Sequence, residues 1–145
     1  MTELKASPVL DKMVQSAHIW VKDIMYELNL SDPDQAYHVL RTTLQALRDR
    51  LPPAEAVHLG AQLPSLIRGV YYEGWKIADK PLKIRKKEEF YEHISELYNA
   101  PLAVEQETAA RAVFKLLYHH LSEGEVKKIK EITPVKLQEL WPHKV

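Results

Sequence analysis

Leucines recur at helical spacing near the middle of the chain, and this pattern constrains the fold more than any other feature. They stand at positions i, i+4, i+7 and i+11, on one face of an α-helix. Pro52 and Pro53 follow the last leucine directly, and a proline ends a helix at the residue before it. The apolar face consists of Leu40, Leu44, Leu47 and Leu51, and the other faces carry Arg41, Gln45, Arg48 and Asp49.

Signals for β-strands are scarce in this sequence. It contains only 4 glycines, no Asn-Gly or Asp-Gly hairpin turn, and no long alternating run of β-branched residues. Ser31, Asp32 and Pro33 precede the leucine-rich helix and supply a capping residue and a first-turn proline. The sequence therefore predicts an all-α fold.

The second half of the chain resembles the first after a shift of 70 residues. Residues are identical at seven pairs of positions across this shift, and further apolar positions match, such as Leu44 with Phe114. We therefore expect an internally duplicated helical bundle, in which repeat unit one covers 10–75 and repeat unit two covers 86–141. The identical pairs are Ile24/Ile94, Asn29/Asn99, Arg41/Arg111, Leu47/Leu117, Leu51/Leu121, Glu55/Glu125 and Pro64/Pro134.

Each repeat unit is expected to contain three helices. The third helix of each unit carries a proline, Pro64 or Pro134, and proline removes a backbone donor and kinks or breaks a helix. Both third helices should therefore be broken there. The expected helices cover 10–28, 32–51 and 53–73 in unit one, and 86–99, 103–121 and 123–140 in unit two.

The composition is that of an ordinary globular protein. Hydrophobic residues make up 46% of the 145 positions and charged residues 28%, which excludes an intrinsically disordered chain. The absence of cysteine excludes disulfides, thiolate zinc sites and a cysteine nucleophile. The first residues do not follow the order of a signal peptide, and no apolar run is long enough to span a membrane. We expect one soluble, cytoplasmic domain over 1–145.

A connector over 76–85 joins the two repeat units and begins a strongly basic stretch. From residue 76 to residue 87 the chain carries six lysines and arginines against Asp79 alone, a charge of +5. Such a stretch could contact nucleic acid, but the whole chain has no net charge, whereas nucleic-acid-binding domains are commonly basic. We expect nucleic-acid binding, if any, to be weak. The candidate basic patch is Lys80, Lys83, Arg85, Lys86 and Lys87.

One stretch of the chain is specific enough to identify a family resemblance. Residues 36–75 read AYHVLRTTLQALRDRLPPAEAVHLGAQLPSLIRGVYYEGW, and their most distinctive piece is LRDRLP at 47–52. This stretch closely resembles the uncharacterised bacterial family known as domain of unknown function 2267, and the second half resembles it more loosely. The resemblance implies an all-helical, duplicated fold and carries no assigned reaction. The second unit departs from the pattern where Thr133 replaces the Leu63 that precedes the proline.

An aromatic group near the end of repeat unit one is the sharpest local feature. Arg68, Tyr71, Tyr72 and Trp75 lie within two helical turns, and these residue types dominate protein–protein binding sites. The same residues could instead close the end of the apolar core, with Gly74 ending the helix. These four residues form the candidate interaction surface.

The histidines of the chain invite a metal hypothesis, which the spacing does not support. A carboxylate-bridged metal bundle needs Glu-x-x-His motifs on facing helices in each half, and only Glu55 and His58 have that spacing. Across the shift of 70 their counterparts are Glu125 and Lys128, and a lysine ammonium is not a ligand. No serine lies in a glycine-framed turn and no glycine-rich phosphate loop is present. We predict no metal site, no cofactor and no catalytic residue.

The sequence thus favours a non-enzymatic, soluble helical protein-interaction module. The alternative is a protein that binds a small ligand or a metal in a pocket between the two repeat units, near Tyr71, Gln62 and His58. The second alternative is weak nucleic-acid binding through the connector. A protein partner and self-association both stay open, and no membrane contact is expected.

Overall fold

The computed structural model describes residues 5–143, and these form eight α-helices and one short 3-10 helix. Within these residues no strand is present, and none of the helices has the length and apolar character needed to cross a membrane. The all-α prediction is confirmed. The elements are α1 (Pro8–Leu28), α2 (Pro33–Arg50), α3 (Pro53–Gly60), α4 (Ser65–Tyr72), η1 (Ile77–Asp79), α5 (Lys87–Glu96), α6 (Gln106–His120), α7 (Glu123–Ile132) and α8 (Val135–Gln138).

Side-chain caps and prolines set where the helices begin. The side chains of Ser7, Asp32 and Ser122 accept hydrogen bonds from backbone N–H groups in the first turns of α1, α2 and α7. Pro64 and Pro134 stand directly before α4 and α8. The helices expected over 53–73 and 123–140 are therefore each broken before the proline, as predicted. Each proline lacks an N–H donor and cannot continue the helix before it.

The largest differences from the sequence-based expectation lie in the connector and after α5. The connector contains a 3-10 turn, Ile77–Asp79, which has no helical period long enough to detect. The first helix of the second half ends at Glu96 instead of residue 99, and the chain has no helix until Gln106. Pro101 lies in this gap, and the residue before a proline disfavours helical geometry.

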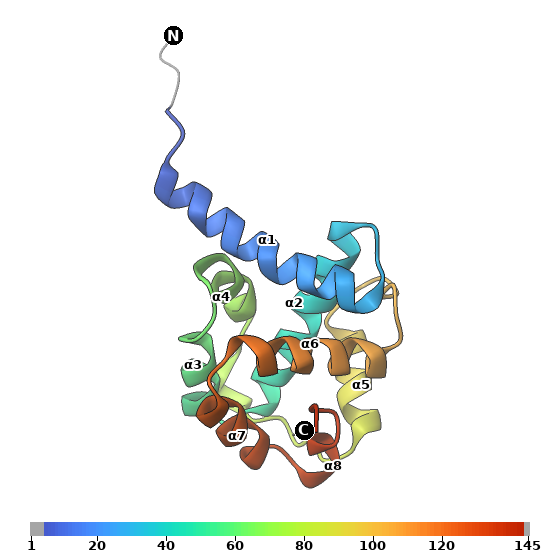
Figure 1. Ribbon diagram of the computed structural model, residues 1–145. Coiled ribbons are helices and arrows are strands. Elements are labelled where there is room, and N and C mark those ends of the chain that lie inside the picture. The colour runs from blue at the N-terminus through green and yellow to red at the C-terminus, as the bar shows by residue number, and fades with distance from the viewer. Residues whose placement is uncertain (1–4, 144–145) are drawn as a thin grey trace.

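Helix α2 lies at the centre of the fold and contacts α1, α3, α4, α5 and α6 (Figure 1). The four leucines of its apolar face are each no more than 1% exposed. Side chains from α1 through α8 share one continuous apolar core around it. Because α2 contacts helices from both halves of the chain, residues far apart in sequence meet along its surface.

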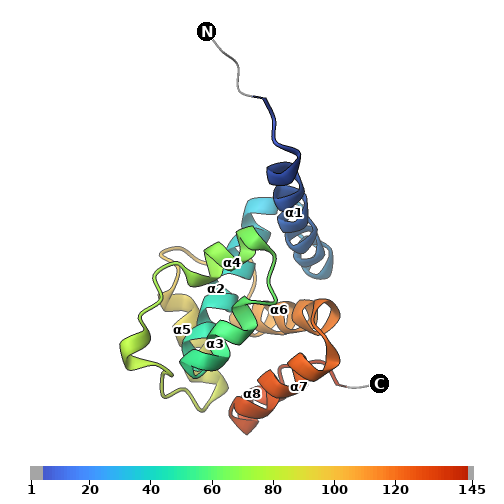
Figure 2. The same cartoon turned by 90° about the vertical axis from the view of Figure 1, so that its left-hand side faces the viewer.

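Helix α1 is only partly supported by the rest of the protein. Its C-terminal half packs on α2, α4 and α6 through Trp20, Val21 and Ile24. Its N-terminal turns extend beyond the other helices (Figures 1 and 2). Val9 is 64% exposed, Leu10 59% and Val14 44%. The first half of α1 therefore presents apolar side chains to solvent.

Candidate functional site

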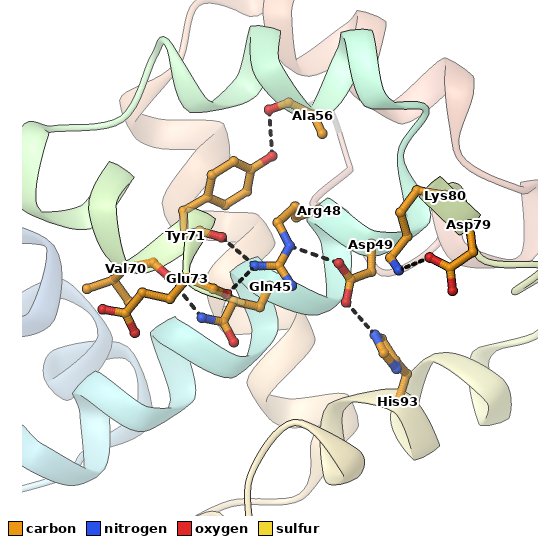
Figure 3. A network of polar contacts seen from close by, with 10 residues as sticks. All are labelled: Gln45, Arg48, Asp49, Ala56, Val70, Tyr71, Glu73, Asp79, Lys80 and His93. Carbon is orange, nitrogen blue, oxygen red and sulfur yellow. Dashed lines mark hydrogen bonds and ion pairs between the residues drawn. The ribbon is translucent and has the colours of Figure 1, made fainter. Parts of the chain in front are cut away.

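A buried polar network occupies the C-terminal turns of α2 (Figure 3). Gln45, Arg48 and Asp49 lie on faces of this helix other than the leucine face, and they are 2%, 2% and 3% exposed. They are buried because α2 is surrounded: α4 and α5 cover the faces that a surface helix would leave to solvent. Charged groups at this depth need partners to offset the loss of hydration.

Arg48 and Gln45 provide donors to the carbonyl groups at the C-terminal end of α4. Nη1 of Arg48 donates to the carbonyl oxygens of Tyr71 and Glu73, each at 2.8 Å, and Nε2 of Gln45 donates to that of Val70 at 2.8 Å. The last carbonyls of a helix have no partners within the helix itself. Two side chains of α2 thus satisfy the end of α4 and hold the two helices together.

Asp49 connects Arg48 to α5. One carboxylate oxygen accepts a hydrogen bond from Nε of Arg48, and Nε2 of His93 lies 2.8 Å from the other. Burial raises the pKa of Asp49, but the hydrogen bonds with His93 and Arg48 outweigh it and hold the pKa below its usual value. The backbone carbonyl of Asp49 also accepts from the N–H of Leu82 at 2.8 Å. One turn of α2 therefore anchors α4, α5 and the connector.

Tyr71 completes the network on the side of α3. Its ring is fully buried, and its hydroxyl donates to the carbonyl oxygen of Ala56 at 2.7 Å. Burial raises the pKa of this phenol well above its ordinary value, so the hydroxyl is protonated throughout the physiological range. Tyr71 therefore ties α4 to α3, just as Arg48 ties α4 to α2.

The network lies inside a region that a known family model matches. The model for "Uncharacterized conserved protein (DUF2267)" matches residues 17–140, which include all of α2 through α8. The chain belongs to this family. A search of curated proteins found no match to this DUF2267 chain.

The candidate interaction surface of the DUF2267 chain is largely engaged within the protein. Tyr71 is fully buried, so it cannot contact a partner, and its inclusion in a surface was wrong. The guanidinium of Arg68 donates to three carbonyl oxygens at the end of α3 and in the turn before α4. Tyr72 and Trp75 are half-buried against the core, with ring centroids 5.5 Å apart. These residues close the end of the core and brace the turn between α3 and α4.

Gly74 follows α4 in a tight turn. The N–H of Trp75 donates to the carbonyl of Tyr72 at 3.2 Å, and Gly74 between them has a φ of +70°. A glycine is favoured at this position because side chains strain a backbone with positive φ. The turn places Trp75 against Tyr72.

The candidate basic patch is partly neutralised. Lys80 forms an ion pair with Asp79 at 2.6 Å, and Lys87 forms one with Glu139. Lys83, Arg85 and Lys86 are exposed. The connector is fixed to α2, because Nε of Arg50 donates to the carbonyl oxygen of Ile84, whose side chain is buried.

Several histidines of the DUF2267 chain lie beside single carboxylates. Within residues 5–143 no group of three or more metal-binding side chains comes together. His58 lies 3.8 Å from Glu125, and His120 lies 2.7 Å from Asp23. His93 has a carboxylate at each ring nitrogen, Asp49 at Nε2 and Glu96 at Nδ1. The nitrogens of His93 are thus held by carboxylates of α2 and α5.

The LRDRLP motif contains the sequence feature that could have indicated the buried network, and helical periodicity alone does not reveal it. Arg48 and Asp49 stand between two buried leucines in the last turns of α2, where a charged pair is ordinarily exposed. Their partners in α4 and α5 lie 23 to 44 residues further along the chain. The contacts of the network join α2 to its neighbouring helices and pair the buried charges.

Proposed function

We propose that this DUF2267 protein is a non-enzymatic interaction module that holds a partner protein on the N-terminal half of α1. The observation that carries the proposal is an apolar stripe, consisting of Leu10, Met13, Val14 and Ala17. This stripe lies on the same face of α1 as the buried residues Trp20, Val21 and Ile24, and extends that face toward the N-terminus.

Other helices cover only the C-terminal part of this face of α1, although the apolar sequence pattern continues toward the N-terminus. Leu10 is 59% exposed and Val14 44%, while Ile24, on the same face, is fully buried. A short helix that lacks packing on its apolar face is marginally stable in water, so a partner that covers the stripe would stabilise it. A surface of this kind suits an apolar helix or groove on another protein.

The stripe is also nearly neutral. Asp11 and Lys12 are the charged residues of the first two turns of α1, and their charges cancel. Electrostatic attraction therefore contributes little, and the partner is expected to bind through apolar burial with a weak dependence on salt.

Substituting the stripe tests the proposal. Leu10→Glu/Val14→Glu is expected to reduce the amount of partner captured from the native lysate at least tenfold, because two buried carboxylates would oppose binding. The matched control is Gln15→Glu/His18→Glu, which places the same charge on an exposed face of the same helix. The amount of captured partner is compared between variants that circular dichroism shows to have the same helical content.

The outcome also separates two kinds of partner. If light scattering gives a dimer for the unmodified protein and a monomer for Leu10→Glu/Val14→Glu, the partner is a second copy. Equal capture by the stripe variant and the control would contradict the proposal.

We also infer that the two halves arose by duplication of one unit. Several local features repeat at a shift of 70 residues. Leu51 and Leu121 both end a helix in extended geometry, with φ and ψ of −82° and 146° against −94° and 161°. Pro64 and Pro134 precede α4 and α8 with φ and ψ of −58° and 152° against −56° and 146°. Such agreement is expected of copies of one unit.

A reciprocal pair of side-chain contacts between α3 and α7 supports a two-fold relation between the halves. Lys128 lies 3.6 Å from Glu55, and His58 lies 3.8 Å from Glu125. The shift of 70 exchanges the glutamates with each other and His58 with Lys128, so each pair maps onto the other. This reciprocity is typical of a two-fold contact.

The helix packing follows the same exchange, because α1 packs on α6 and α5 packs on α2. Superposing α2–α4 on α6–α8 in a crystal of this protein should require a rotation of about a half turn. A rotation far from a half turn would contradict the inference.

Two further elements complete the proposal. Nucleic-acid binding through the connector is disfavoured, since Lys80 and Lys87 are paired with carboxylates. A cytoplasmic location suits a chain of 145 residues without cysteine.

A further inference from the structure

A cavity of about 760 Å³ lies between the end of α6, α7 and the chain after α8. Its volume falls within the range of about 300–1,000 Å³ that is usual for small-molecule sites. Leu121, Val126 and Trp141 are buried side chains in its wall, and Tyr118 is half-buried beside them. Lys127 and Lys130 also line it, as does Glu123.

The corresponding place in the first half is filled, if the halves are related by the duplication proposed above. The shift of 70 matches Trp141 with Tyr71 and Pro142 with Tyr72. In the first half the ring of Tyr72 lies so close over Gly60 that a Cβ atom there would overlap its hydroxyl. Trp75 packs against Tyr72, with ring centroids 5.5 Å apart. An aromatic side chain thus fills the first half at this point.

The second half has different residues at the same positions. Pro142 replaces the large ring of Tyr72, and Lys130 replaces Gly60. Lys127 replaces Val57, so two ammonium groups stand where the first half has none. The residue that matches Trp75 is Val145, which lies outside the described residues. The ring is lost, and positive charge is gained beside the space it would occupy.

We propose that this cavity binds a small aromatic anion. The aromatic ring would occupy the place that Tyr72 fills in the first half, against Val126 and Trp141. Its anionic group would be held by Lys127 and Lys130, neither of which forms an ion pair within residues 5–143. Lys130 is half-buried, and a partly desolvated ammonium binds an anion more strongly than an exposed one.

Fluorescence titration with anilinonaphthalene sulfonate, an aromatic sulfonate, tests the proposal on the full chain. The expected result is saturable binding at one site per chain. Lys127→Ala/Lys130→Ala should weaken it about tenfold, because charge-assisted hydrogen bonds to the sulfonate are lost. Lys136→Ala, which removes an exposed lysine outside the cavity, should leave it unchanged.

A transplant from the first half gives the sharper variant. Lys130→Gly/Pro142→Tyr introduces the pair that fills the equivalent place, and it should abolish binding while the helical content is retained. If this variant does not fold, Trp20→Phe/Trp75→Phe leaves Trp141 as the sole indole of the chain. Energy transfer from Trp141 to the bound probe should then be observed.

Three results would overturn the proposal. They are the absence of saturable binding, displacement of the probe by octanesulfonate as effectively as by naphthalenesulfonate, and undiminished binding by a folded transplant variant. The superposition test of the duplication measures helix positions alone. Failure of the duplication is therefore distinguishable from failure of the binding site.

Discussion

Replacing Asp49 with alanine is expected to lower the free energy of unfolding by about 3–5 kcal/mol, because it leaves a buried charge without its partner. Arg48 is 2% exposed, and Asp49 is the carboxylate within ion-pair distance of its guanidinium. His93 loses the same partner at 2.8 Å, which also weakens the contact between α2 and α5. Urea denaturation followed by circular dichroism measures the loss.

The control for this prediction removes both charges together. Arg48→Met/Asp49→Leu fills the volume with apolar groups and leaves neither member of the pair without its partner, although it also removes the donors to the carbonyls of Tyr71 and Glu73. It should therefore cost less than the sum of Arg48→Met and Asp49→Leu. A double variant that loses as much stability as the sum of the two single changes would show that the pair is not coupled.

The pH dependence of stability follows from the same carboxylate. The pKa of Asp49 is lower in the folded protein than its usual value of 3.8, so the unfolded chain binds a proton more readily. The stabilisation is complete above the unfolded value and is lost as pH falls through the folded value. Asp49→Asn should therefore show a shallower loss of stability below pH 3.8 than the unmodified protein.

Replacing Phe114 with alanine is expected to cost about 3–5 kcal/mol, the loss usual for a large aromatic side chain in a core. Phe114 is 1% exposed and stacks on Trp141, with ring centroids 4.5 Å apart and planes inclined by 16°. Its ring also lies 6.0 Å from that of Phe90. The change would leave a cavity where α5, α6 and the chain after α8 meet.

Leucine at position 114 provides the matched control, because the shift of 70 residues matches Phe114 with Leu44. Phe114→Leu retains most of the buried apolar volume, so its loss should be less than half that of Phe114→Ala. Thermal unfolding and urea denaturation should agree on this order. Equal losses for the two variants would show that stacking on Trp141, and not volume, dominates.

The helices could be predicted because their signals are local. The leucine spacing of α2 and the prolines before α4 and α8 each act within a few residues of the backbone. Periodicity could not place the 3-10 turn of the connector, because three residues do not complete a repeating pattern. Local physics thus accounts for most of the element boundaries.

The buried network could not be predicted, because its partners are distant in sequence. Gln45 bonds to a carbonyl 25 residues away, and Asp49 bonds to a side chain 44 residues away. The sequence reveals the aromatic group, but the orientation of its side chains depends on α3, which supplies carbonyl partners of Arg68 and Tyr71. A sequence gives no direct information about which face of a helix another helix will cover.

The central position of α2 makes hydrogen exchange informative. The amide protons of its buried turns, from Val39 to Asp49, are enclosed by other helices, so they should exchange only when the whole protein unfolds. The amides in the first turns of α1 should exchange through local opening. One experiment would therefore report two events separately. Slower exchange in α1 alone would indicate occupancy of the apolar stripe, and slower exchange in α2 would indicate a gain in global stability.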